Sequence, residues 1–183
     1  MILTGDAIER AREDGSIVLD PFETDALNPN SYNFRLGETL IVISHQADAR
    51  ENRSQITLPR AGMVLQPRRL YLASTLETIG SSKYAMTILG RSSLGRLGLF
   101  LNITADLGHV GSASRWTLEL SVVQPLRVYP NMRIGQVAFW STAGPQKQYQ
   151  GRYSAQISPA VCEDRDLVGT LAQGGIGSHD SNW

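Results

Sequence analysis

The sequence predicts a mainly β protein, built as a barrel or jelly roll, with one helix at its N-terminus and one short helix within the β body. Short runs of apolar and β-branched residues recur along the chain, and Gly, Pro, Asn and Asp separate them. At 183 residues the chain can bury one full core, so we expect one domain over residues 1–153. The remaining residues 154–183 are expected to form a C-terminal tail that is a flap or is partly disordered.

The N-terminal helix is expected to run from about Thr4 to Asp14. Thr4 can cap its first turn, Ile8 and Ala11 give it an apolar side, and Gly15 ends it. These signals are local and independent of one another, so they predict a helix ahead of the β body.

The β body is predicted from the apolar runs that follow this helix. The expected strands are Ile17–Leu19, Thr39–Ile43, Met63–Leu65, Leu70–Leu72, Ala85–Ile88, Leu101–Ile103, Trp116–Val123, Leu126–Tyr129 and Ile134–Trp140. A short helix is expected at Ser92–Leu97, and the polar segment Ala47–Gln55 is expected to be an exposed loop.

Charge and cysteine content exclude several classes of partner. Lys plus Arg and Asp plus Glu number 17 each, so the chain has no net charge to attract nucleic acid or an anionic membrane. Residues 1–10 carry Asp6 and Glu9 and lack the apolar core of a signal peptide, and no run has the length of a membrane span. Cys162 is the single cysteine, which fits a reducing compartment. We therefore expect a soluble cytoplasmic protein that binds neither nucleic acid nor membrane.

The segment Gly90–Leu99 has the composition of a polyanion site. Arg91 and Arg96 can neutralise phosphate oxygens, while Ser92, Ser93 and backbone N–H groups at the start of a short helix supply directed donors. The alternative is a capped surface helix with no ligand.

Glu119 is a second signal, because it lies inside an apolar run. In a strand whose Leu118 and Leu120 face one side, Thr117 and Glu119 face the other, so that a carboxylate is held at a fixed point beside buried structure. A carboxylate held in this way is a candidate general base. The alternative is a structural ion pair of Glu119 with an arginine, for which Arg96 and Arg115 are the candidates.

Together these motifs resemble the dCTP deaminases of the dUTPase superfamily. The matching segments are Asn30–Gly37, Arg91–Gly98, Thr117–Leu120, Arg133–Val137 and Tyr149–Gly151. The resemblance covers most of the chain to about residue 153 and implies a dUTPase-like distorted β-barrel. It also implies a homotrimer with active sites between subunits.

The resemblance further implies roles for individual residues. Glu119 would activate the water that attacks C4 of cytosine, assisted by Ser92, Arg96 and the backbone around Ala105, and ammonia would leave. The expected nucleotide-binding residues are Arg91, Ser92, Ser93, Arg96, His109, Thr117, Leu118, Tyr149 and Arg152.

No protein-bound cofactor is expected. Zinc deaminases need a His-x-Glu and a Pro-Cys-x-x-Cys, whereas this chain has one cysteine and three scattered histidines. Members of the resembled family likewise work without zinc. Any Mg²⁺ is expected to accompany the nucleotide triphosphate.

The chain also departs from the family pattern. His109 stands for an aspartate that binds the sugar 3′-hydroxyl, and Ser112 stands for an aromatic residue that excludes a 2′-hydroxyl, so a polar gap is expected there. Asn33 replaces an aspartate, and Arg152 replaces a glutamine of the C-terminal flap. The alternative explanation of the sugar loop is drift at a tolerant position.

The leading hypothesis is therefore zinc-independent hydrolytic deamination of a cytosine nucleotide, with dCTP giving dUTP and ammonia. Three alternatives stay open. The substrate is a ribonucleotide or a lower phosphate, such as CTP or CMP; or the chain is a dUTPase-like nucleotide diphosphatase, alone or after deamination; or it is a catalytically idle trimer that binds nucleotide.

Overall fold

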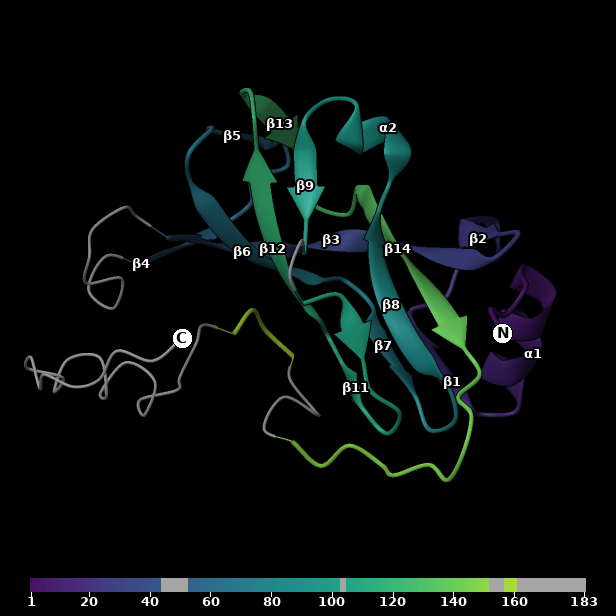
Figure 1. The fold of residues 1–183 in the computed structure, drawn as a ribbon. Helices are drawn as coiled ribbons and strands as arrows, with labels where there is room; N and C mark the ends of the chain where they lie inside the picture. The colour runs from purple at the N-terminus through teal and green to yellow at the C-terminus, as the bar shows by residue number, and fades with distance from the viewer. Residues whose placement is uncertain (44–52, 103–104, 152–156, 161–183) are drawn as a thin grey trace, which may run out of the picture.

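The structure is a computed structural model that describes residues 1–43, 53–102, 105–151 and 157–160 (Figure 1). Within these residues two α-helices and one 3₁₀ helix accompany the β-strands. The helices are α1 (Gly5–Glu13), η1 (Thr24–Ala26) and α2 (Ser92–Gly95). The strands are β1 (Ile17–Asp20), β2 (Leu27–Asn28), β3 (Ser31–Ile43), β4 (Arg53–Thr57), β5 (Met63–Leu65), β6 (Leu70–Thr75), β7 (Thr78–Ser81), β8 (Ala85–Gly90), β9 (Leu99–Leu101), β10 (Leu107–Gly108), β11 (Ala113–Ser114), β12 (Thr117–Val122), β13 (Leu126–Val128) and β14 (Arg133–Trp140).

The strands form three antiparallel sheets among the described residues. The largest has the order β10-β8-β14-β3-β6-β12-β9, and β2 and β4 also pair with β3. A second sheet has the order β1-β7-β11, and β5 pairs with β13. The mainly β prediction with an N-terminal helix and a short internal helix is therefore confirmed.

The long strand β3 joins the two halves of the largest sheet. Its first half pairs with β14 and its second half with β6, and the register to β6 shifts between Leu36 and Leu40. Gly37 lies at this bend, where a Cβ atom would be only 2.8 Å from the Ser74 hydroxyl oxygen. A glycine is thus required for β3 to approach β6 as it changes partners.

Helix α1 forms as the sequence predicts. The Ala7 N–H donates to the Thr4 hydroxyl over 3.4 Å, Ile8 and Ala11 are buried, and Gly15 follows the helix with φ of 78°. The helix packs against β1 and β3 and closes one side of the core. None of the helices in the described part of the chain is long and apolar enough to cross a membrane.

Several predicted boundaries are wrong. Helix α2 ends at Gly95 and not at Leu97, and β6 extends past Leu72 to Thr75. Strand β9 ends at Leu101 instead of beginning there, because Asn102 adopts a left-handed backbone with φ of 44°. The end of the predicted loop Ala47–Gln55 belongs to β4, which pairs with β3 from Arg53 onward, while residues 47–52 lie outside the described residues. Of the predicted tail, residues 157–160 are described and the rest lies outside.

Several strands were not predicted at all. They are β2, β4, β7, β10, β11 and the first half of β3. Most are short or polar and lack the alternation or apolar runs that mark a strand. The first half of β3 is the exception, because polar and apolar residues alternate there from Ser31 to Leu36. Pairing with neighbours that are distant in the sequence, such as β7 with β1, decides their conformation.

Candidate functional site

Strand β12 positions Glu119 as the alternation predicts. Leu118 and Leu120 are buried in the core, and Thr117 and Glu119 lie on the opposite face of the strand, half-buried. Glu119 is directly opposite Leu72 of β6. The carboxylate is therefore carried by a strand that has a neighbour on each side and a buried face beneath it.

A cavity of about 440 Å³ opens on this face of β12. Its volume is in the range of small-molecule sites. It brings together five of the predicted site residues, namely Ala105, His109, Thr117, Glu119 and Tyr149. Other parts of its lining were not predicted from the sequence, among them Asn102, Arg115, Trp116 and Ala160.

Backbone contacts hold Glu119 in place and leave its carboxylate available. The Glu119 N–H donates to the Asn102 side-chain oxygen over 3.1 Å, and the Glu119 carbonyl accepts the Asn102 N–H over 3.0 Å. Within the described residues the carboxylate itself makes neither a hydrogen bond nor an ion pair. The alternative of an ion pair with Arg96 or Arg115 is thus not found in the described part of the chain.

Aromatic rings form the wall around His109. The His109 and Tyr149 rings stack with centroids 5.3 Å apart and planes 27° apart. The Tyr149 N–H donates to the Val110 carbonyl over 2.7 Å, which ties the segment after β14 to the loop that carries His109. Ser112 does not leave an open gap, because it is 8% exposed and its hydroxyl donates to the His109 carbonyl over 2.8 Å. The ring beside this loop comes from Tyr149 instead.

Trp116 and Ala160 complete the wall. The Trp116 indole N–H donates to the Ile79 carbonyl over 3.1 Å, and the ring lies so close to Gly108 that a Cβ atom there would be 2.1 Å from it. The Ala160 N–H donates to the Thr117 hydroxyl over 2.9 Å. An aromatic residue at the start of β12 was the available signal for Trp116, whereas nothing in the sequence marked Ala160.

The segment of residues 91–96, with its two arginines and two serines, does not line the cavity. Ser92, Ser93 and Arg96 are exposed on and beside α2, and the Arg91 guanidinium donates to the Arg133 carbonyl over 3.0 Å. Figure 1 places α2 at one end of the fold and β11, beside the cavity, at the other. None of these four residues lines the cavity that contains Glu119.

The remaining predicted site residues are Leu118 and Arg152. Leu118 is fully buried in the core, so that only its backbone can face the cavity. Arg152 lies outside the described residues. No group of three or more His, Cys, Asp or Glu side chains that could hold a metal occurs in the described part of the chain.

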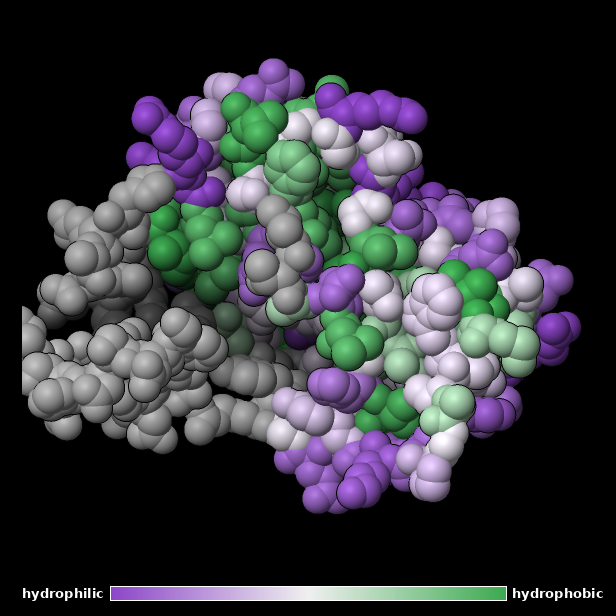
Figure 2. Space-filling view, in the orientation of Figure 1, coloured by the Kyte–Doolittle hydropathy of each residue, from purple (hydrophilic) through white to green (hydrophobic). Residues whose placement is uncertain are grey.

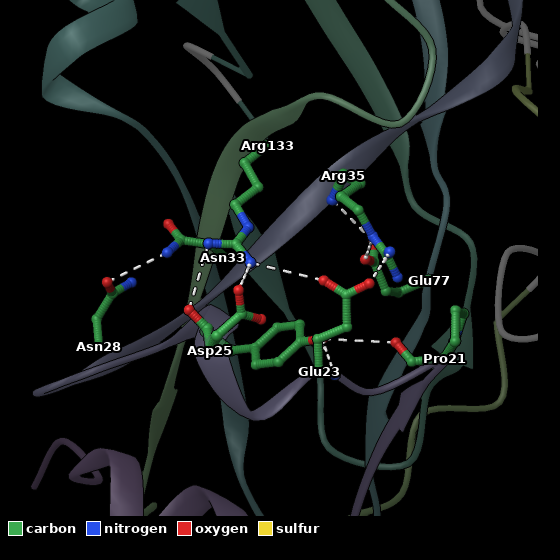
Figure 3. A network of polar contacts seen from close by, with 9 residues as sticks. Pro21, Glu23, Asp25, Asn28, Asn33, Arg35, Glu77 and Arg133 are labelled. Carbon is green, nitrogen blue, oxygen red and sulfur yellow. Dashed lines mark hydrogen bonds and ion pairs between the residues drawn. The ribbon is translucent and has the colours of Figure 1, made fainter.

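A separate polar network lies around the first half of β3 (Figure 3). Arg35 pairs with Glu77 and Glu23, and Arg133 pairs with Asp25 over 2.6 Å. Burial alone would lower the pKa of Arg35, but hydrogen bonding to Glu77 and the charges of Glu77 and Glu23 outweigh burial and raise it. The pKa of Arg133 is raised chiefly by its hydrogen bond to Asp25.

Asn33 belongs to the same region as this network. Its side-chain N–H donates to the Asn28 side-chain oxygen over 3.2 Å, and it is 8% exposed. Asn33 does not line the cavity, so the amide has a structural contact where the resembled family has a charge.

Comparison with known proteins adds a family context to this geometry. The profile of the family described as dCTP deaminase-like matches residues 2–142. The chain is 42% identical over 157 residues to a protein named "dCTP deaminase, dUMP-forming" from Hathewaya histolytica, covering 84% of this chain and 91% of that protein. It is 44% identical over 180 residues to a protein named "dCTP deaminase" from Rhodopirellula baltica, covering 91% and 89%.

A solved structure shares the fold. The crystal structure of 2′-deoxycytidine 5′-triphosphate deaminase from Agrobacterium tumefaciens matches with a TM-score of 0.62 and 21% identity, over 75% of this chain and 47% of that chain. This likeness agrees with the mainly β architecture predicted from the sequence.

Proposed function

The chain belongs to the dCTP deaminase-like family, and from this premise we propose that it is an enzyme that deaminates a cytosine nucleotide, converting dCTP to dUTP and ammonia. The observation that carries the proposal is the Glu119 carboxylate, which lies in a cavity of nucleobase scale with no partner among the described residues. A carboxylate fixed by its strand and free at its oxygens can take a proton from water.

The proposed reaction is a hydrolysis at C4 of cytosine. Glu119 takes a proton from water, and the water oxygen bonds to C4. Glu119 passes this proton to N3 and then moves the proton of the new C4 hydroxyl to the amino nitrogen. The C4–N bond breaks, the C4 carbonyl forms and ammonia leaves. The carbonyl of Ala105, a residue of the cavity lining, would accept a hydrogen bond from the amino group.

The chain is proposed to act without zinc, because a single cysteine cannot supply the ligand set of a zinc deaminase. Mg²⁺ would arrive with the triphosphate as part of the substrate. The same single cysteine, Cys162, is the reason for proposing a reducing cytoplasm as its location.

We further propose a homotrimer in which a neighbouring copy supplies Arg91, Ser92, Ser93 and Arg96 to the cavity. None of these four residues lines the cavity of its own chain, so the site needs a second copy to contain both them and Glu119. Figure 2 shows apolar residues gathered over β12, β9 and β6 on this face.

Near α2, three apolar residues are strongly exposed: Leu97 by 47%, Phe100 by 44% and Val123 by 64%. Such a patch marks an interaction surface. Light scattering is expected to give three times the chain mass. Phe100→Asp is expected to weaken the trimer and deamination together, while Tyr129→Asp, at an equally exposed position of 44%, leaves both intact. An active monomer would contradict the intersubunit site.

Formation of dUMP is the second candidate function, because several relatives carry "dUMP-forming" in their names. It requires hydrolysis of the triphosphate after deamination. Among the described residues that line the cavity, Glu119 is the one carboxylate, so both steps would rely on it. The lack of a second carboxylate among these residues favours dUTP as the product.

One assay separates the candidates. Purified protein is incubated with dCTP, CTP, CMP and dUTP, and the cytosine-to-uracil absorbance change is followed together with pyrophosphate release. Absorbance change without pyrophosphate supports deamination to dUTP, and pyrophosphate from dCTP or dUTP supports dUMP formation. Tight nucleotide binding with neither signal would instead identify an idle nucleotide-binding trimer.

A further inference from the structure

Asn102 has an unusual backbone for a buried residue. Its φ is 44°, in the left-handed region, and it is 6% exposed. This conformation is costly for residues with a Cβ atom, although Asn tolerates it better than most. It occurs where β9 ends and the chain leaves the sheet, beside the cavity.

The side-chain oxygen of Asn102 takes the place of a backbone carbonyl in the pairing with β12, at the point where the β9 backbone leaves the sheet. Strand β9 pairs with β12 from Leu99 to Leu101, opposite Val122 to Leu120. The next position on β12 is Glu119, whose N–H would normally meet a backbone carbonyl of the partner strand. Here that N–H donates to the Asn102 side-chain oxygen over 3.1 Å, while the Asn102 N–H donates to the Glu119 carbonyl over 3.0 Å.

The carboxamide N–H groups of Asn102 bind two more backbone groups. They donate to the Thr117 carbonyl over 3.2 Å and to the Ala105 carbonyl over 3.4 Å. One side chain therefore connects the strand that carries Glu119 with Ala105, another residue of the cavity lining. A carbonyl oxygen has two lone pairs, so the Ala105 carbonyl can also accept a hydrogen bond from a ligand.

We propose that Asn102 is a positioning residue that sets the Glu119 carboxylate and the Ala105 carbonyl at the spacing needed for attack on C4, an inference that rests on the function proposed above. Asn102 acts through backbone groups and transfers no proton. A displacement of about 1 Å between reacting groups can reduce a rate by about 10²-fold, so such a connection acts on turnover more than on nucleotide affinity.

The test uses Asn102→Gly, because glycine adopts a φ of 44° without strain while the side chain that carries the carboxamide is removed. Asn131→Gly is the matched control. Asn131 also has a left-handed backbone, with φ of 64°, but it lies in the turn before β14, outside the cavity.

Asn102→Gly is expected to lower kcat for dCTP by about 10- to 100-fold. The Kd for dCTP is measured in the double variant of Asn102→Gly and Glu119→Gln, because Glu119→Gln prevents turnover. It should stay within about threefold of the Kd of Glu119→Gln alone, because the connection acts on turnover and not on affinity. Asn131→Gly should keep the wild-type kcat. In the wild type the Glu119 amide should be protected from hydrogen exchange, and Asn102→Gly should release it.

Asn102→Asp provides a second variant of the same size. It keeps an oxygen for the Glu119 N–H but has no donor for the carbonyls of Thr117 and Ala105, so it should also lose kcat. A wild-type kcat in Asn102→Gly, or a loss of dCTP affinity with kcat retained, would overturn the positioning role. A wild-type protein that deaminates no cytosine nucleotide would instead overturn the proposed function, and the positioning role with it.

Discussion

Glu77 and Glu119 are both carried by the β body, yet their surroundings are opposite. Glu77 is fully buried, and it accepts hydrogen bonds from the Arg35 N–H over 2.8 Å and from the Arg35 side-chain Nε over 2.7 Å (Figure 3). Glu119 is half-buried, and its carboxylate has no partner within the described residues. A buried carboxylate must be paired to be tolerated, whereas one in a cavity can be left available for a ligand.

The comparison separates two uses of the same side chain. Arg35 and Glu77 hold β3 against the turn between β6 and β7, and Glu23 and Arg133 extend this contact to η1 and β14. The contacts that the described residues make with Glu119 are to its backbone, and they fix the strand without engaging the carboxylate. Stability is therefore expected to depend on the first cluster and turnover on the second.

The largest expected effect is on stability, in Glu77→Gln. Removing the charge leaves the Arg35 guanidinium, whose side chain is 15% exposed, without the fully buried carboxylate that accepts its Nε–H, and breaking a buried pair typically costs about 3–5 kcal/mol. Urea unfolding measures this loss, with Glu38→Gln at an exposed position of β3 as the control. An unchanged free energy of unfolding would show that the pair contributes nothing net.

Glu119→Gln is expected to give the reverse result. The amide keeps the shape of the side chain but cannot take a proton, so kcat should fall by about 10²-fold or more while nucleotide binding and the free energy of unfolding stay unchanged. Single-turnover assays and urea unfolding on the same preparation check both parts. Full activity in this variant would show that Glu119 is not the general base.

Sugar selectivity should show a smaller effect at the cavity wall. With His109 in place of an acidic residue, we expect CTP or CMP to be used within about a hundredfold of dCTP in kcat/KM. His109→Asp should move preference toward dCTP by about tenfold or more, on the scale of one altered pocket contact. Competition assays with mixed nucleotides measure the ratio. Rejection of every ribonucleotide by about 10⁴-fold in the unmodified protein would assign the sugar gate to another residue.

The smallest effect is expected at the exposed edge of the ion-pair network. The Asp25 side chain is 75% exposed, so Asp25→Asn should cost no more than about 1 kcal/mol despite its 2.6 Å contact with Arg133. Any cost should shrink in high salt, because screening weakens exposed pairs. Urea unfolding at low and high ionic strength checks this. A loss as large as that of Glu77→Gln would contradict the distinction between buried and exposed members.

The sequence by itself determined the features that depend on neighbouring residues. The Thr4 cap and the apolar side of α1 specify that helix, and the alternation from Thr117 to Leu120 specifies which way Glu119 points. The short helix expected at Ser92–Leu97 forms as α2, which ends two residues earlier, at Gly95. Each of these signals lies within a few residues, where periodicity and capping act.

Tertiary structure alone decided how distant segments meet. Arg35 and Glu77 are 42 residues apart in sequence, and nothing local marks them as partners. Tyr149 reaches His109 only because the segment after β14 binds the loop at Val110, and Asn102 acts on Glu119 only because β9 ends against β12. Strand pairing and cavity walls depend on long-range contacts, whose selection is governed by packing across the whole fold and not by local preference.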